Sequence, residues 1–245
     1  MRIISGKNPV KEAIKTKKVL KVYISKKLKN KDKKDIENLS EKYNVKRLYV
    51  DDDKIDKISD TRVHQGVAAE AKDFEYSSIE ESIRLAEDKG EKPFFIILDQ
   101  ITDVNNLGAI IRSAECSGVH GVVIPKHRSA KINETVSKTS AGAVEFINII
   151  QVTNLNRTIE DLKEKGFWVY GADMNGDKYY YEEDYSTPVA IVIGSEGSGI
   201  SRLVRENCDV IIEIPMKGKI NSLNASSSAS ILMFEVMKKR DVNES

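Results

Sequence analysis

The sequence has few of the residues that stabilise small secreted proteins or bind metals. Its two cysteines, Cys116 and Cys208, lie far apart and form no CxxC pattern. A disulfide framework is therefore excluded, and a reducing compartment is expected. The three histidines, at positions 64, 120 and 127, are too scattered to predict a metal site.

Long hydrophobic runs are also missing. No stretch approaches the ~18 consecutive apolar residues of a membrane helix. The opening residues, MRIISGKNPV, lack the apolar segment of a signal peptide. These absences predict a soluble cytoplasmic protein without a membrane partner.

The common nucleotide-binding and hydrolase motifs do not occur. In GSEGSG the glycines stand at positions 194, 197 and 199, which is not the GxGxxG spacing. The sequence contains no GK[ST], GxSxG or HExxH. P-loop, α/β-hydrolase and zincin chemistry are therefore not expected.

What is present includes enough apolar residues for a core and an uneven distribution of charge. Hydrophobic residues make up 40% of 245, and the net charge is only +1. Residues 1–34, however, contain 13 Lys or Arg against two acids, Glu12 and Asp32, a local excess of +11. Such asymmetry favours nucleic acid or another anionic surface as a partner. Solvated, lysine-rich helix faces would produce the same pattern.

The hydrophobic periodicity predicts an α/β protein in two parts. Residues 1–72 alternate between helix and strand signals and form a small α/β domain, and residues 73–92 form a linker or the first helix of the second domain. From 93 to 245, strands alternate with helices, which predicts a mostly parallel sheet covered on both faces. The expected strands cover residues 19–25, 45–50, 66–71, 94–99, 119–125, 167–173, 188–194 and 210–215.

Three strand ends are followed by loops rich in small or polar residues. QITDVNNLG follows the strand at 94–99, SEGSG follows the strand at 188–194, and MKGKINSLNAS follows the strand at 210–215. In open parallel sheets, ligands bind outside the carboxyl ends of the strands. These loops are therefore the expected site, although tight turns of an α/β fold would also explain their composition.

These loops belong to longer segments that carry a family resemblance. LDQITDVNNLGAIIRSAECSGVHGVVIP, IVIGSEGSGISRLVRENCDVIIEIPM and GKINSLNASSSASILMFE resemble, in order, the three motifs of the SpoU, or TrmH-type, RNA ribose 2′-O-methyltransferases. VHQGVAAEA, at residues 63–71, resembles the end of that family's amino-terminal RNA-binding domain. The arrangement is most similar to the RlmB branch, which methylates a guanosine of 23S ribosomal RNA.

The resemblance implies a fold, a cofactor and partners. It implies an RNA-binding domain at 1–72 and a SPOUT methyltransferase domain with a trefoil knot at 93–245. It further implies S-adenosylmethionine as cofactor, large-subunit ribosomal RNA as substrate, and a homodimer with sites at or near the interface. A transfer-RNA 2′-O-methyltransferase and a non-catalytic RNA-binding protein remain alternatives.

The resemblance also implies two sets of site residues. Cofactor-binding residues would be Gly194, Ile214 and Leu223. Residues of the methyl-transfer site would be Arg112, Asn106, Glu196, Ser222 and Asn224.

Each of these polar residues has a simpler alternative explanation. Arg112 would stabilise a developing ribose alkoxide, since a guanidinium is not deprotonated in proteins, but it could be a solvated helix residue. Asn106, Ser222 and Asn224 could be helix caps, and Glu196 could merely complement a helix dipole.

A basic loop and a cysteine outside these two sets also allow a prediction. The basic loop KHR at 126–128 either contacts RNA phosphates or is simply solvated. Cys116, four residues after Arg112, is expected to be a buried packing residue.

Overall fold

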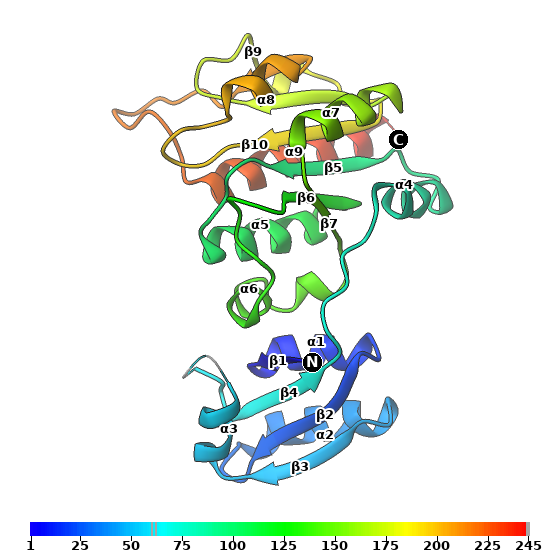
Figure 1. Ribbon diagram of the computed structural model, residues 1–245, viewed down its shortest axis with the longest axis vertical. Helices are drawn as coiled ribbons and strands as arrows, with labels where there is room; N and C mark the ends of the chain where they lie inside the picture. The colour runs from blue at the N-terminus through cyan, green and yellow to red at the C-terminus, as the bar shows by residue number, and fades with distance from the viewer. Residues whose placement is uncertain (60, 62, 244–245) are drawn as a thin grey trace. The chain divides into compact units, whose positions relative to one another are not determined.

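The computed structural model describes residues 1–59, 61 and 63–243, and it divides the chain into two compact units (Figure 1). The amino-terminal unit consists of Met1–Glu75 together with Lys131–Phe146. The carboxyl-terminal unit consists of Tyr76–Ala130 and of the chain from Ile147 onward.

The amino-terminal unit is built on a mixed sheet with the strand order β1-β4-β2-β3, blue to cyan in Figure 1. Strand β4 pairs antiparallel with β1 and β2, and β2 pairs parallel with β3. The elements are β1 (Arg2–Ser5), α1 (Lys7–Lys15), β2 (Val19–Ser25), α2 (Asn30–Lys42), β3 (Lys46–Val50), α3 (Asp52–Ile58) and β4 (Val67–Ala71).

Side-chain alternation along these strands gives the sheet two buried faces. On one face Val22 and Ile24 of β2 pack with Ile14 of α1 and Ile36 of α2. On the other face Tyr23 packs with α3. Helices α1 and α2 therefore cover one side of this sheet and α3 covers the other.

A segment from the second half of the chain completes the amino-terminal unit. It contains α6 (Glu134–Thr139) and a 3-10 turn, η1 (Ala143–Glu145). Arg2 donates to both carboxylate oxygens of Glu145 at 2.7 Å, and the buried Glu134 accepts a hydrogen bond from Ser59 at 2.5 Å. Residues 131–146 were expected in the second domain, 93–245. In the structure they belong to the first unit, because an ion pair and a hydroxyl hydrogen bond join them to Arg2 and Ser59.

The carboxyl-terminal unit contains a sheet with the strand order β7-β6-β5-β10-β8-β11-β9, and all of the pairings between its described strands are parallel. Its strands are β5 (Phe94–Leu98), β6 (Gly121–Pro125), β7 (Asn148–Val152), β8 (Trp168–Ala172), β9 (Lys178–Tyr179), β10 (Val189–Ile193) and β11 (Val210–Glu213). Its helices are α4 (Ile79–Asp88), α5 (Val104–Cys116), α7 (Leu155–Glu164), α8 (Arg202–Asn207) and α9 (Ala225–Asn243), with a 3-10 turn η2 (Tyr180–Glu182).

Helices cover both faces of this sheet, as the uninterrupted apolar strands predict. Helices α7 and α8 pack on the face that carries Phe95 and Ile97. Helices α5 and α9 contact each other on the opposite face, where the Ser113 and Ser230 hydroxyls lie 2.8 Å apart. Helix α4 lies in the expected linker 73–92, but it packs against the core through Ile79 and Ile83 and so belongs to this unit.

Within residues 1–59, 61 and 63–243, no helix is both long and apolar enough to span a bilayer.

Candidate active site

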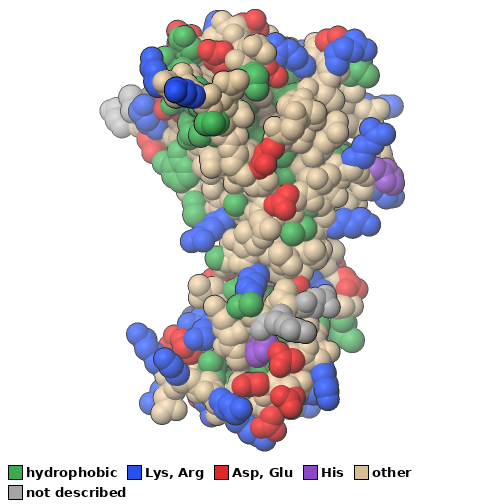
Figure 2. All heavy atoms as spheres, turned by 90° about the vertical axis from the view of Figure 1, so that its left-hand side faces the viewer, with side chains coloured by type: hydrophobic (Ala, Val, Ile, Leu, Met, Phe, Trp, Pro, Cys, Tyr) green, Lys and Arg blue, Asp and Glu red, His purple; other side chains and the backbone are tan. Residues whose placement is uncertain are grey.

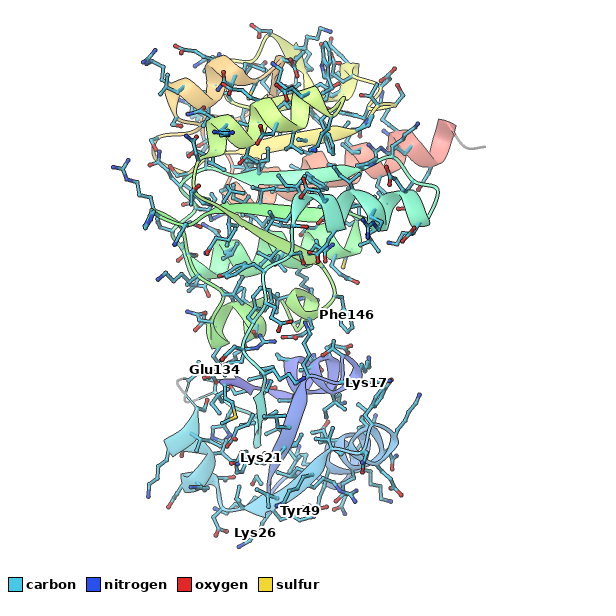
Figure 3. The ribbon with its side chains drawn as sticks, turned by 45° about the vertical axis from the view of Figure 1, so that its right-hand side comes forward. Lys17, Lys21, Lys26, Tyr49, Glu134 and Phe146 are labelled. Atoms are coloured by element: carbon cyan, nitrogen blue, oxygen red, sulfur yellow. The ribbon has the colours of Figure 1, made fainter. Side chains whose placement is uncertain are left out.

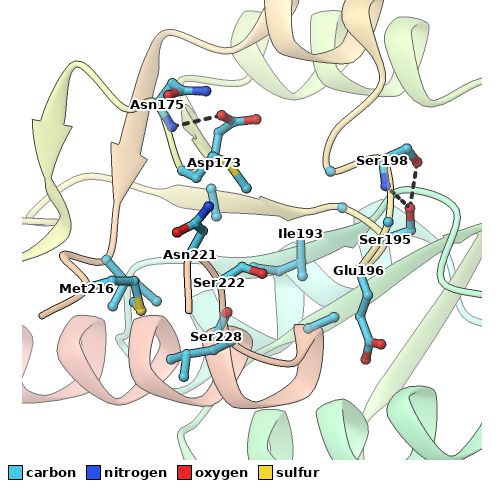
Figure 4. Close-up of a pocket in the computed structure, with 18 of the residues that line it drawn as sticks. Asp173, Asn175, Ile193, Ser195, Glu196, Ser198, Met216, Asn221, Ser222 and Ser228 are labelled. Carbon is cyan, nitrogen blue, oxygen red and sulfur yellow. Dashed lines mark hydrogen bonds between the residues drawn. The ribbon is translucent and has the colours of Figure 1, made fainter. Parts of the chain in front are cut away.

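A cavity of about 330 Å³ lies at the carboxyl ends of three neighbouring strands, β10, β8 and β11 (Figure 4). Loops that follow these strands form its walls, as expected for a parallel sheet. One part of the lining is apolar and another part carries hydroxyl, amide and carboxylate groups. The lining includes Ile193, Ile212, Ile214, Met216 and Leu223, and also Asp173, Asn175, Ser195, Ser198, Asn221, Ser222 and Ser228.

The loop after β10 folds back on itself at the cavity. Ser195 and Gly199 exchange two backbone hydrogen bonds, of 3.1 and 2.9 Å. A Cβ atom on Gly194 would lie 2.0 Å from the carbonyl carbon of Gly199, so only glycine permits this approach. Gly199 itself has a φ of 64°, a value that favours glycine. The glycines of GSEGSG therefore shape the wall of the cavity.

The three expected cofactor-binding residues all line this cavity. Gly194 follows β10, Ile214 follows β11, and Leu223 belongs to the loop that leads into α9. Ser222 lines the same cavity, is exposed, and has no hydrogen bond to another described residue. The alternative that Ser222 caps α9 is therefore wrong.

Glu196 links two of the other expected residues through hydrogen bonds. Its Oε1 accepts a bond from Asn106 Nδ2 at 2.8 Å and a shorter one from Asn224 Nδ2. Asn224 Nδ2 also donates to Asn106 Oδ1 at 3.0 Å. Side chains from α5, from the loop after β10 and from the start of α9 thus converge at the edge of the cavity.

The helix-cap alternatives are settled by the same contacts. The N-cap of α5 is Asp103, whose Oδ1 accepts from the Asn106 backbone N–H at 2.8 Å, so Asn106 is not the cap. Asn224 does act as a cap, because its Oδ1 accepts from the Ser226 N–H at 2.9 Å. The Asn224 side chain therefore stabilises α9 with its oxygen and binds Glu196 with its nitrogen.

Arg112 stands apart from this group. It lies on α5, is exposed, and does not line the cavity. Its guanidinium has no hydrogen bond or ion pair with the described part of the chain. The exposed guanidinium is available to a ligand or to a second copy of the chain.

Sequence reasoning missed the contribution of the loop after β8. Asp173 and Asn175 line the cavity because β8 lies between β10 and β11 in the sheet. The signal was present as ADMNGD, a small and polar segment directly after an apolar strand. The order of the strands, which places this loop beside the other two, was not predicted.

The cysteines and the basic loop lie outside the cavity lining. Cys116, the last residue of α5, is exposed, so the expectation of a buried packing residue is wrong. Burial raises the pKa of the Cys208 thiol to about 12. Residues 126–128 are exposed after β6. The described residues contain no group of three His, Cys, Asp or Glu side chains that could bind a metal.

Comparison with known families identifies both parts of the chain. The sequence model of the SpoU rRNA Methylase family matches residues 93–234. The model described as RNA 2′-O ribose methyltransferase substrate binding matches residues 3–77. The first match covers more than half of the chain.

Several bacterial relatives match along almost their whole length. YacO of Bacillus subtilis, named as a TrmH family tRNA/rRNA methyltransferase, is 43% identical over 97% of this chain and 96% of its own. A relative of the same name in Staphylococcus haemolyticus is 42% identical, again over 97% and 96% of the two chains.

Two crystal structures share the fold. The SpoU methyltransferase AviRb of Streptomyces viridochromogenes, in complex with the cofactor AdoMet, superposes with a TM-score of 0.81 at 20% identity, over 98% of this chain and 90% of its own. An AdoMet-bound rRNA methyltransferase of Sinorhizobium meliloti gives 0.76 at 21% identity, over 97% and 87%. The expected fold class, a small α/β domain followed by a SPOUT-type α/β domain, is confirmed.

Proposed function

The chain belongs to the SpoU rRNA methylase family, and from this premise we propose that it methylates a ribose 2′-hydroxyl in structured RNA. It is an RNA methyltransferase of the SpoU/TrmH type. The proposal concerns which atom receives the methyl group and which RNA is the substrate. The observation that carries the proposal is the set of bonds joining Asn106, Glu196 and Asn224 at the edge of the cavity. They bring together side chains from all three motif segments.

The cavity suits S-adenosylmethionine as the cofactor. Its volume of about 330 Å³ falls within the usual range for small-molecule sites, ~300–1,000 Å³. Ile214 and Leu223 offer apolar surface to the adenine ring and the methionyl chain. Around Gly197 the space is open, because a Cβ there would meet no atom within 4 Å. Gly194, Ile214 and Leu223 would hold the adenosyl part.

When bound, this cofactor supplies an electrophilic methyl group on a sulfonium. The residues of the chain then position the acceptor oxygen, because in-line displacement depends strongly on alignment. The Asn106–Glu196–Asn224 bonds fix the loop after β10 relative to α5 and α9. The Arg112 guanidinium stabilises the developing alkoxide and grips a neighbouring phosphate, since a fixed cation at that oxygen lowers the barrier.

The location of Arg112 supports a homodimer. In one chain Arg112 does not line the cavity that holds Glu196. A dimer with sites at or near the interface would bring the exposed Arg112 of one copy to the cavity of another. Each site would then contain residues of both copies.

The amino-terminal unit would capture the RNA. Its residues 1–75 contain 20 Lys or Arg and 13 Asp or Glu. Several lysines pair with acids: Lys7 with Asp32 at 2.5 Å, and Lys26 with Asp51 at 3.1 Å. Figure 2 likewise shows acidic side chains lying between lysines and arginines on this unit. The sequence excess of +11 therefore overstates the charge that is free to meet phosphate.

Several lysines without an ion pair to any described residue lie on α2 or directly before it. Among them are Lys29, Lys31 and Lys34. The Lys33 ammonium lies 4.8 Å from the ring centre of Tyr49, a β3 residue that is 45% exposed (Figure 3). Basic groups beside an exposed aromatic ring suit an unpaired, splayed base and its phosphates. We assign RNA contact to this group of residues, called the α2 face: Lys29, Lys31, Lys33, Lys34 and Tyr49.

For the substrate we propose a guanosine of 23S ribosomal RNA. The resemblance to the RlmB branch supports this choice, and the names of the relatives allow both ribosomal and transfer RNA. Mapping of 2′-O-methyl positions in both RNAs from a deletion strain tests it. Loss of one ribosomal guanosine signal, restored by the intact gene, is expected. Loss only in transfer RNA would favour the alternative substrate, and no loss would favour a non-catalytic RNA-binding protein.

The cavity wall provides a direct test of cofactor binding. Leu223→Asp should weaken S-adenosylmethionine binding at least ~10-fold, because a carboxylate would be desolvated against the ligand. The side chain is 39% exposed, so the fold should survive. Ser222→Ala should change the free energy of unfolding by less than ~0.5 kcal/mol, since no cap is lost.

Calorimetric titration and denaturant unfolding measure these two effects. Ile220→Asp is the matched control, because Ile220 is in the same loop, is 76% exposed and does not line the cavity. Equal cofactor affinity in a folded Leu223→Asp variant would remove this loop from the cofactor site.

A further inference from the structure

We propose that Asp173 recognises the ribose cis-diol of the cofactor, with its Oδ2 atom accepting hydrogen bonds from the 2′- and 3′-hydroxyls. This role rests on the proposed function, because it assumes that the cavity binds an adenosyl group. Asp173 follows β8, the strand between β10 and β11, and its side chain lines the cavity. Figure 4 shows it on a different side of the cavity from Glu196.

One oxygen of this carboxylate is fixed by the protein. Oδ1 of Asp173 accepts a hydrogen bond from the Asn175 N–H at 3.0 Å, and it lies 3.3 Å from Nη1 of Arg205. Arg205 Nη2 also donates to the Asn175 carbonyl at 3.0 Å, which holds the loop and the guanidinium together. The Asp173 backbone N–H donates to Ile212 of β11. The carboxylate is therefore oriented before any ligand binds.

The other oxygen is left for a ligand. Oδ2 of Asp173 has no hydrogen bond with the residues the structure describes, although the side chain is only 19% exposed. A Cβ atom placed on Gly199 would lie 3.5 Å from this oxygen. The glycine loop thus runs past Oδ2 without a side chain to cover it. A carboxylate oxygen accepts hydrogen bonds, so the hydroxyls of a ligand in the cavity would donate to Oδ2.

The chemistry favours hydroxyl groups over the cofactor's ammonium. Arg205 already offsets the charge of Asp173, so the remaining lone pairs suit neutral donors. An acidic side chain at the carboxyl end of a strand binds ribose hydroxyls in the same way in dinucleotide-binding folds. The other carboxylate of the cavity, Glu196, already accepts from two asparagines. Asp173 is therefore the acidic residue assigned to the diol.

Three ligands separate the possible contacts in the full-length protein. S-adenosylhomocysteine carries both diol and ammonium, 5′-methylthioadenosine carries the diol alone, and its 2′,3′-dideoxy form carries neither. Asp173→Ala should weaken the first two by about 10- to 100-fold, the range for a hydrogen bond to a charged group. It should leave the dideoxy ligand unchanged. Titration calorimetry gives these affinities without any measurement of methyl transfer.

Two other variants complete the test. Asp177→Ala, an exposed aspartate outside the cavity lining, is the control and should bind all three ligands like the wild type. Asp173→Asn keeps the shape of the side chain and should show a smaller loss confined to the two diol ligands, so it decides the matter if the alanine variant does not fold.

Each outcome has a distinct meaning. An unchanged preference for the diol ligands in both Asp173 variants would overturn the inference and leave the proposed function standing. A loss for S-adenosylhomocysteine alone would assign Asp173 to the ammonium and also overturn it. Failure of the wild type to bind S-adenosylhomocysteine at all would reject the proposed function instead.

Discussion

Replacing Arg112 by alanine is expected to lower methyl transfer to RNA by about 10²–10³-fold, the usual effect of removing one electrostatic contact to the transition state. Cofactor affinity and the free energy of unfolding should change little. The side chain is exposed and has no hydrogen bond or ion pair among the described residues, so its removal leaves no buried group unsatisfied. The rate is measured by transfer of a labelled methyl group to ribosomal RNA.

Arg112→Lys should also fail, because an ammonium cannot reproduce the planar fork of a guanidinium. Arg84→Lys, on α4, is the matched control and should retain full turnover. Turnover near the wild-type level in Arg112→Lys would contradict the proposed contact to the alkoxide and phosphate.

A mixture of two impaired variants, assayed at a cofactor concentration too low to saturate Leu223→Asp, tests the sharing of sites between subunits. Arg112→Ala and Leu223→Asp each damage one part of the site. If a site takes Arg112 from one copy and the cavity from another, mixed dimers contain one intact site and recover part of the activity. Absence of recovery, in dimers shown to have exchanged subunits, would place Arg112 and the cavity of the same chain in one site.

Neutralising the α2 face is expected to give the second large effect. Lys31→Ala combined with Lys34→Ala should weaken RNA binding by about 10-fold or more at ~150 mM salt. The variant would make fewer phosphate contacts, so its binding would release fewer counterions. The slope of log affinity against log salt should become shallower by about 1–2. Filter binding across a salt series measures both quantities.

The control variant makes the same change in net charge on the opposite face of the sheet. Lys54 and Lys57 are exposed residues of α3, which packs on the face away from α2. Lys54→Ala with Lys57→Ala should lower RNA affinity far less. Equal losses in the two variants would mean that net charge alone, and not the α2 face, attracts the RNA.

Substitution is a cleaner test here than deletion of residues 1–72. Val136 and Val144, in the segment 131–146, are buried within the amino-terminal unit. Deletion would expose them and confuse loss of RNA binding with loss of folding. The lysine variants leave this packing intact.

Much of the architecture was predictable because it depends on local sequence. Runs such as FFIIL at 94–98 and VAIVI at 189–193 are apolar on both faces, and they form the central parallel strands β5 and β10. The strand predicted at 19–25 coincides with β2 at both ends. Short strands with weaker signals, β1, β7 and β9, were missed.

The cavity residues were predictable only through the motif resemblance. Gly194, Ile214 and Leu223 line one cavity, as the resemblance implied, although nothing in their local pattern required it. The glycines alone indicated a tight turn. The close approach of the Gly194 and Gly199 backbones depends on the folded loop, so it could not be predicted from the glycines alone.

Local sequence predicted most of the strands and helices, together with the polar loops that come after the strands, because these depend on neighbours a few positions apart. Tertiary structure decided which loops meet. Asn106 and Glu196 are 90 positions apart, and Asp173 reaches the cavity only because β8 inserts between β10 and β11. It also decided which lysines remain free, since Lys21 meets Glu70 across paired strands. Such contacts depend on strand order and register, and these are set by burial over the whole sheet.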